Sequence, residues 1–180
     1  MENKAKYNAL ITKRKMDTEY LRKYITENIV KLVFFNTEYG GISSDSEVHE
    51  IHKFKSKYRG NTYISIPLKV ITTDDGNYIT GVDFDYENKT PTGFAVVSKH
   101  DLRDLSKDMK KAKKDERIAY GKKLCEEYVK NLNLIISDKV FNVTINDSEG
   151  NELFNKDVYG EFKDVNSFAL KEMDRLGSMK

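Results

Sequence analysis

The stretch DLRDLSKDMKKAKKDERIAYGKKLCEEYVKNL, residues 101–132, decides the expected fold because its apolar and charged residues recur at helical spacing. At 100° per residue, the side chains of its first half separate into three stripes along one helix. The basic stripe, about 120° wide, consists of Arg103, Lys107, Lys110, Lys113, Lys114 and Arg117. The acidic stripe consists of Asp101, Asp104, Asp108 and Asp115, and the apolar stripe of Leu102, Leu105, Met109, Ala112 and Ala119. We therefore expect one long helix that packs by its apolar stripe and presents its cations to solvent or to a partner.

The two ends of this helix differ in character. Ser98, with Asp101 three residues later, predicts a capping box at its start. After Arg117 the apolar positions rotate to the angle that the cations held before, and they are Ile118, Gly121, Cys125, Tyr128, Val129 and Leu132. The rotation predicts either a break between Asp115 and Arg117 or a helix that leaves one neighbour and packs on another.

The N-terminal part of the chain is expected to be helical. Apolar residues between Leu21 and Phe35 cluster within about 140° of a helical wheel, as in a helix that faces a core. The run IVKLVFF, residues 29–35, is also typical of a strand, but helix is the preferred interpretation. Residues 1–16 are rich in Lys and weakly amphipathic, and we expect them to form an extended or frayed helical segment.

An antiparallel β-meander is expected between the two helical regions, in segments 47–58, 61–72, 78–86 and 94–97. The first segment is polar enough for an edge strand. Pro67 in the second favours an edge position or a bulge. The sequence DDGN at 74–77 predicts a hairpin turn between the second and third segments.

A hairpin and a last helix complete the expected fold. Residues 133–146 and 152–162 flank the turn 147–151, and residues 164–176 form a helix capped by Gly177. The order helix, meander, long helix, hairpin, helix predicts the α+β class, because it lacks the alternation of a parallel sheet. A length of 180 residues favours a single domain spanning residues 1–180.

Composition limits the classes of partner. Hydrophobic residues make up 38% of the chain, enough for a core, and charged residues 33%, with a net charge of only +2. Attraction to nucleic acid must therefore come from local patches. The longest apolar run, at 32–35, is too short for a membrane span, and the N-terminus lacks an apolar signal core, so we expect a cytoplasmic protein without a membrane partner. The only cysteine, Cys125, is expected to be buried and inert.

One stretch resembles a nuclease motif. Asp75, Asp83, Asp85, Glu87 and Lys89 resemble the sparse pattern of the PD-(D/E)xK nucleases. The resemblance implies Mg²⁺ held by the carboxylates and a lysine that orients the attacking water. The chain departs from the pattern at residue 74, where the family has proline, and lacks the expected crossover helix after the motif. A polar, solvent-facing side of an antiparallel strand is the simpler interpretation.

A second pattern, His49-Glu50-Ile51-His52, falls short of a zinc site. The metalloprotease motif needs two histidines four residues apart on a helix, whereas these are three apart on an expected strand, which places them on opposite faces. The glycines stand singly at turns and helix ends, and the pair Gly40-Gly41 lacks the residues of a phosphate loop. We therefore expect no metal, no cofactor and no catalytic residue.

A chain with segregated charge and no assembled catalytic set is interpreted as a non-enzymatic interaction protein. The basic stripe from Arg103 to Arg117 would bind a partner protein with an acidic groove, and Asp83, Asp85 and Glu87 would bind a basic one. The alternative is a nucleic-acid-binding module in which residues 103–117 contact phosphates with little base preference. A metal-dependent nuclease is the second alternative. The sequence leaves the oligomeric state open.

Residue usage adds a hint about origin, since only six of the 31 Lys and Arg residues are Arg and Asn, Ile and Tyr are common, as in AT-rich genomes. In size and composition the chain is similar in general character to phage and mobile-element inhibitors of host defence, such as the type II anti-CRISPR proteins that bind Cas9. The resemblance implies a stoichiometric protein in a bacterial host that inhibits a nucleic-acid-handling defence enzyme, such as a Cas9 effector or its guide complex. Those inhibitors share no common fold, so no residue is carried over from them.

Overall fold

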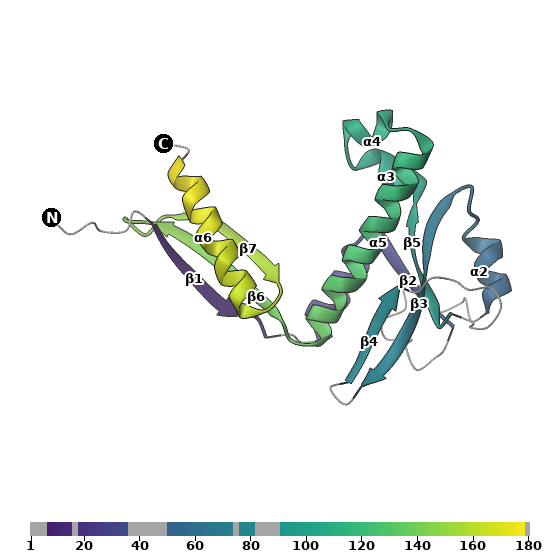
Figure 1. Cartoon of the computed structure of the whole chain (residues 1–180), viewed down its shortest axis with the longest axis horizontal. Helices are drawn as coiled ribbons and strands as arrows, with labels where there is room; N and C mark the ends of the chain where they lie inside the picture. The colour runs from purple at the N-terminus through teal and green to yellow at the C-terminus, as the bar shows by residue number, and fades with distance from the viewer. Residues whose placement is uncertain (1–6, 16–17, 36–49, 74–75, 82–90, 179–180) are drawn as a thin grey trace. The chain divides into compact units, whose positions relative to one another are not determined.

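The computed structural model describes residues 7–15, 18–35, 50–73, 76–81 and 91–178 (Figure 1). Helices and antiparallel sheets make up the fold, which confirms the predicted α+β class. The described residues divide into two compact units. Unit 1 contains residues 7–15 and 134–178, and unit 2 contains the residues between 18 and 133. The single domain spanning residues 1–180, which the chain length favours, stays a prediction.

Unit 2 is built on a four-stranded antiparallel sheet with the order β2-β5-β3-β4. The strands are β2 (Val30–Phe34), β3 (Tyr63–Thr73), β4 (Gly76–Gly81) and β5 (Gly93–Ser98). The helices are α1 (Thr18–Glu27), α2 (Ile51–Lys57), α3 (Lys99–Asp104), α4 (Lys107–Lys111) and α5 (Lys114–Ile136). Because β5 lies between β2 and β3, the chain crosses over after β4, and the predicted simple meander is wrong.

Both faces of this sheet are covered by helices. On one face, Leu32 and Leu68 of the sheet pack in the same cluster as Cys125 and Leu132 of α5. On the other face, a smaller cluster joins α2 to the sheet, and the rings of Phe54 and Phe94 stack with their centroids 4.1 Å apart. A strand buried on both faces needs apolar side chains at successive positions, and this explains the run FAVV in β5.

The same principle corrects the N-terminal prediction. Residues 30–34 form β2, which pairs in register with β5 from Val30↔Val97 to Phe34↔Gly93, so the strand interpretation of IVKLVFF is right and the helix is wrong. Its apolar run serves two buried faces rather than one helical face. Residues 7–13 form β1, a strand of the second sheet, so the frayed helical segment is also wrong there. Only α1, at 18–27, keeps the predicted helical form.

The expected edge strand at 47–58 is wrong as well, because residues 51–57 form α2. Phe54 and Tyr58 lie four residues apart, and both are buried in the cluster against the sheet. This spacing is that of one helix face. Residues 47–49 lie outside the described part of the chain.

The predicted strands at 61–72 and 94–97 are confirmed, and the one at 78–86 is confirmed as far as residue 81, since residues 82–86 lie outside the described residues. β3 lies where the alternation of its apolar residues placed it, and it pairs with β4 up to Thr73↔Gly76, in agreement with the predicted hairpin. Pro67 lies inside β3 opposite Phe94 of β5, and the position that would face it on the β4 side is outside the described residues. The Leu68 carbonyl accepts from Thr92 N–H at 2.9 Å, so the backbone polar groups of Leu68 point toward β5. Those of its neighbour Pro67 point to the opposite side, toward β4. Pairing with β4 begins only at Leu68↔Gly81, so the missing proline N–H breaks no described ladder bond.

The long helix expected from residue 101 to 132 is three helices. Breaks lie at 105–106, between α3 and α4, and at 112–113, between α4 and α5. Ser98 caps α3 as predicted, accepting from His100 N–H at 3.1 Å. Ser106 caps α4 in the same way, accepting from Met109 N–H at 3.1 Å. A second serine cap, which supports a new helix start, explains why the helical wheel does not run through.

Unit 1 is a three-stranded antiparallel sheet with one helix. β1 (Tyr7–Lys13), β6 (Val140–Asp147) and β7 (Glu152–Tyr159) lie in the order β1-β6-β7, and α6 (Phe162–Ser178) follows. Val165 and Ala169 of α6 are buried in a cluster with Val143 and Ile145 of β6. The predicted hairpin and C-terminal helix are confirmed, but the first strand begins at Val140 and not at residue 133, because α5 continues to Ile136. α6 continues through Gly177, which is therefore not its cap.

Candidate interaction surfaces

The predicted basic stripe lies on a segment that changes helix twice, and we call residues 99–120 the charged segment. Its cations are distributed over three helices and a break: Arg103 in α3, Lys107 and Lys110 in α4, Lys113 before α5, and Lys114 and Arg117 in α5. The 100° spacing does not hold across the breaks, so a single stripe on one continuous helix is not formed. Arg117 is half-buried and the other five cations are exposed.

The charged segment also carries exposed acidic residues. Lys110 Nζ lies 3.9 Å from Asp104 Oδ1, and His100 Nδ1 lies 3.3 Å from Asp104 Oδ2 and 3.7 Å from Asp101 Oδ1. Ion pairs this exposed contribute little to stability. In the described part of the chain, Lys110 is the only one of the six cations with such a pair. The other five therefore remain available to a partner.

Two large apolar side chains stand among these charges. Leu105, in the break between α3 and α4, is 46% exposed, and Tyr120 of α5 is 39% exposed. Tyr120 follows Arg117 by three residues, which places both on one side of α5. Exposed aromatic residues beside arginine are typical of the centres of protein interfaces. The charged segment thus combines steering charges with apolar side chains that a partner could bury.

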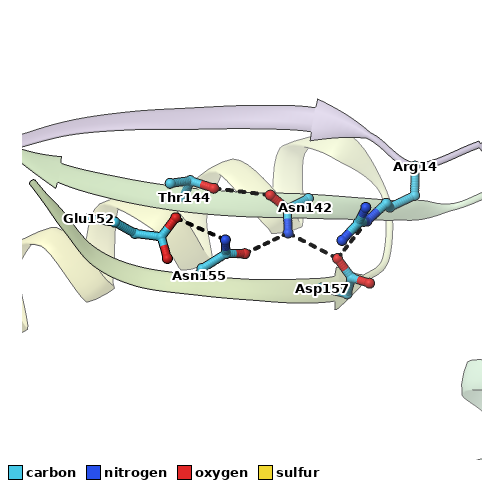
Figure 2. A network of polar contacts seen from close by, with 6 residues as sticks. All are labelled: Arg14, Asn142, Thr144, Glu152, Asn155 and Asp157. Atoms are coloured by element: carbon cyan, nitrogen blue, oxygen red, sulfur yellow. Dashed lines mark hydrogen bonds and ion pairs between the residues drawn. The ribbon is translucent and has the colours of Figure 1, made fainter. Parts of the chain in front are cut away.

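A second surface, which the sequence analysis missed, is the face of the unit 1 sheet opposite α6 (Figure 2). Asn142 Nδ2 donates to Asn155 Oδ1 at 2.8 Å and to Asp157 Oδ1 at 3.1 Å, and Thr144 Oγ1 donates to Asn142 Oδ1 at 3.0 Å. Arg14 Nε reaches Asp157 Oδ1 at 2.9 Å. The network links β6 and β7 to each other and to Arg14, the residue that follows β1. The alternation NVTIN at 142–146 is the signal that would have found this face.

These network residues bond mainly to one another, so they hold the strands in register. The β1 side of the same face differs. Leu10 lies opposite Thr144 and is 61% exposed, and Asn8 and Thr12 on either side of it are also exposed. An exposed leucine in the middle of a polar sheet face is a candidate contact point for another molecule.

The residues of the nuclease pattern and one residue of the histidine pattern cannot be placed. Asp75, Asp83, Asp85, Glu87 and Lys89 lie outside the described residues, as does His49. His52 Nδ1 lies 2.9 Å from Glu50 Oε2 at the start of α2, and both side chains are exposed. Across the described residues, no group of three or more His, Cys, Asp or Glu side chains could hold a metal ion.

Cys125 is a free, buried cysteine of α5, as predicted. Burial raises the pKa of the Cys125 thiol to about 12, and the nearby charge of Glu126 adds to the rise. Because the thiolate is the reactive form, this thiol is inert at neutral pH.

Described residues line two of the hollows on the surface. One, of about 430 Å³, lies in unit 1 and is lined by three successive cations, Lys13 to Lys15, with Ile135, Ile136 and Asp138. Lys13 Nζ lies 2.7 Å from Asp138 Oδ2, which neutralises part of its charge. The other, of about 220 Å³, lies in unit 2 between the sheet and the start of α3.

No family model, curated protein or solved structure matches this chain. Among the described helices, none is both long and apolar enough to cross a bilayer.

Proposed function

We propose that this chain is a non-enzymatic interaction protein that docks on a partner protein through the charged segment. The observation that carries the proposal is the exposure of five of the six cations of the predicted basic stripe, on α3, on α4 and around the start of α5, together with the exposed side chains of Leu105 and Tyr120. A phosphate backbone would use the cations alone. A protein surface with an acidic rim and an apolar centre would use both.

Electrostatics and burial have different roles in such a complex. The cations from Arg103 to Arg117 raise the association rate with an acidic surface, an effect that salt weakens. Leu105 and Tyr120 supply apolar area whose removal from water stabilises the bound state. The charged segment is anchored to the body of unit 2, because Leu102 of α3 is fully buried in the core beside Gly121 of α5. This anchoring supports a role for the segment as a docking surface.

The partner class that we propose is a nucleic-acid-handling defence enzyme of a bacterial host, such as a Cas9 effector with its guide. The support is the general resemblance in size and composition to inhibitors of that kind. The acidic residues of the charged segment, Asp101, Asp104, Asp108 and Asp115, are all exposed and would suit a channel built for phosphates. Asp83, Asp85 and Glu87 would act in the same way.

Titration of guide-loaded Cas9 with the full chain, read out as DNA cleavage and as co-purification, tests the proposal. We expect stoichiometric inhibition that weakens at high salt. Reversal of three cations, in the variant Lys110→Glu, Lys113→Glu and Lys114→Glu, should reduce it. The matched control reverses three exposed lysines later in α5, Lys122, Lys123 and Lys130.

Three outcomes would contradict parts of the proposal. Absence of both binding and inhibition would reject the Cas9-type partner. Inhibition that survives the 110/113/114 variant would reject the basic side of the segment. If the variant Asp101→Lys, Asp104→Lys and Asp108→Lys then abolished it, the acidic residues would be the contact.

A nucleic-acid-binding module is the second candidate, favoured by the cations of the charged segment that lack ion pairs among the described residues. A mobility shift with single- and double-stranded DNA and RNA at about 50 and 200 mM salt brackets the range in which phosphate contacts weaken steeply. A salt-sensitive shift that the 110/113/114 variant abolishes would support this candidate over a protein partner. With Mg²⁺ present, shorter products would instead support a nuclease centred on Asp83, Asp85, Glu87 and Lys89.

A further inference from the structure

The hydrogen bonds of the unit 1 sheet determine which backbone groups of β1 face the edge along which no described strand pairs, which we call the open edge. The Val140 carbonyl accepts from Arg14 N–H at 2.9 Å, whereas the Lys139 carbonyl accepts from Gly160 N–H at 3.1 Å. The backbone N–H and C=O groups of even-numbered residues of β6 therefore point toward β1, and those of odd-numbered residues point toward β7. In β1, by the same alternation, the even-numbered residues bond to β6. The N–H and C=O groups of Ala9 and Ile11 point away from the sheet.

The two edges of this sheet differ in how they are protected against pairing. On β7, the register shifts between Ile145 and Asn146, and Leu153 is the extra residue of the bulge. The rest of β7 carries Glu152, Lys156 and Asp157. A bulge and charges are features that keep an edge strand from pairing with another chain. β1 has neither feature between residues 8 and 12, where Asn8, Ala9 and Leu10 are exposed in succession.

We propose that β1 pairs antiparallel with β1 of a second copy of this chain, which joins the two three-stranded sheets into one sheet of six strands. The symmetry of such a pair fixes which residues meet. Because Ala9 and Ile11 face the open edge, odd-numbered residues must lie opposite odd-numbered ones. The register that pairs all seven residues of β1 places Leu10 opposite Leu10 of the second copy.

In this register every position meets a compatible neighbour. Leu10 and its mate form a non-hydrogen-bonded pair, the arrangement in which side chains lie closest, and each covers the exposed surface of the other. Ala9 lies opposite Ile11, Asn8 opposite Thr12, and Lys13 opposite Tyr7. No two like charges face each other. Hydrogen-bonded pairs exchange two bonds each, so the four pairs of the odd-numbered residues would form about eight.

This complementarity favours a second copy over a foreign peptide as the occupant. A two-fold interface requires that each residue suit its mate across the axis, and β1 meets that requirement along its whole length. The axis runs perpendicular to the sheet, so α6 of both copies remains on the same face. The proposal concerns unit 1 alone and does not depend on the partner proposed for the charged segment.

Sedimentation of the full chain over a concentration series tests the pairing. We expect the mass to rise from one copy to two with increasing concentration. Leu10→Lys, which would set two cations opposite each other, should leave a monomer. The matched control is Leu153→Lys, the same change at an exposed leucine of the β7 edge, and it should dimerise like the unchanged chain. Ala9→Pro should also leave a monomer, since proline removes an N–H that faces the open edge without breaking the bonds to β6.

Disulfide trapping tests the register. With the Cα atoms of a non-hydrogen-bonded pair about 4.5 Å apart, the variant Leu10→Cys should oxidise to a covalent dimer. Asn8→Cys should not, because its mate is Thr12 and the two new thiols would be about four residues apart along the strands. Cys125 does not interfere, because its thiol is buried.

Opposite results would overturn the proposal. These are a monomer at every concentration, a dimer that persists in both Leu10→Lys and Ala9→Pro, or trapping through Asn8→Cys in preference to Leu10→Cys. A monomeric chain that nevertheless bound an extended foreign peptide along β1 would replace the second copy by that peptide. Circular dichroism of each variant distinguishes loss of pairing from loss of the fold.

Discussion

Both polar atoms of the Asn133 side chain bind the backbone of Ile79. The Asn133 Oδ1 atom accepts from Ile79 N–H at 2.8 Å, and Asn133 Nδ2 donates to the Ile79 carbonyl oxygen. Ile79 belongs to β4, the last strand in the sheet order, and lies in register with Val70 of β3. The side-chain amide of Asn133 in α5 therefore makes the hydrogen bonds that a neighbouring strand would make. It satisfies the backbone N–H and C=O groups of Ile79 on the outer edge of β4.

Replacement of Asn133 by Ala should destabilise the fold, because two hydrogen bonds are lost and part-buried backbone groups lose their partner. We expect a loss of about 2 kcal/mol in the free energy of unfolding, measured by urea denaturation. Asn131→Ala on the same helix is the control and should change stability little. A similar loss in both variants would assign the effect to helix propensity rather than to the contact with β4.

Gly93 lies in β5 between Phe34 of β2 and Leu68 of β3. A Cβ atom at this position would overlap the Val33 carbonyl oxygen and lie 2.8 Å from Phe34 Cδ1. Because backbone cannot move aside as a side-chain end can, Gly93→Ala should cost about 3 kcal/mol. Gly60→Ala, with no atom within 4 Å of the added Cβ, is the control and should leave the urea midpoint nearly unchanged. Equal midpoints for the two variants would contradict the packing described for β5.

Sequence patterns identified the strand β6 better than the strand β2 for a physical reason. In β6, one face is apolar and the other polar, so Val143 and Ile145 alternate with Asn142 and Thr144 and the period of two is visible. In β2, both faces are buried, and an apolar run without alternation fits a helix equally well. Composition alone could not separate the two structures there, because the partner strand β5, whose paired residues run from Gly93 to Val97, lies far along the chain.

The candidate surfaces show the same limit. The exposure of the cations from Arg103 to Lys114 could be predicted from their spacing, but their sharing of one stripe could not. The break before α5 depends on local bonds, such as Lys113 N–H to Glu116 Oε2 at 2.8 Å, which a helical wheel does not represent. The open edge of β1 was not predictable, since it requires knowing that the N-terminal segment adds to a hairpin more than a hundred residues away.

Tyr128 illustrates a polar group whose burial should lower stability. The Tyr128 ring stacks on the Tyr24 ring with the two centroids 5.0 Å apart, and Tyr128 is only 3% exposed. Its hydroxyl has no hydrogen-bond partner among the described residues. Burial without a partner costs free energy, so Tyr128→Phe should stabilise the fold by about 1 kcal/mol. Tyr120→Phe, at an exposed position of the same helix, should have no effect on the melting temperature. Destabilisation by Tyr128→Phe would mean that the hydroxyl has a partner.

Asp147 organises the turn between β6 and β7. Its Oδ1 accepts from the backbone N–H groups of Glu149 and Asn151, each at 2.9 Å, and its Oδ2 accepts from Asn151 Nδ2 at 3.0 Å. These bonds, the Asn151 side chain first, favour the carboxylate and hold the pKa of Asp147 below its ordinary value of 3.8. A lowered pKa in the folded state means that Asp147 stabilises the turn above pH 3.8 and that this stabilisation is lost as the pH falls through the folded value.

Carbon-detected NMR titration of the Asp147 carboxyl checks this relationship directly. We expect a midpoint below 3.8 in the unchanged chain and a midpoint closer to 3.8 in Asn151→Ala, which removes the amide that contributes most. Ser148→Ala, in the same turn, should leave the midpoint where it was. A midpoint of 3.8 or above in the unchanged chain would contradict the bonds described for the turn, since a carboxylate that accepts three hydrogen bonds resists protonation.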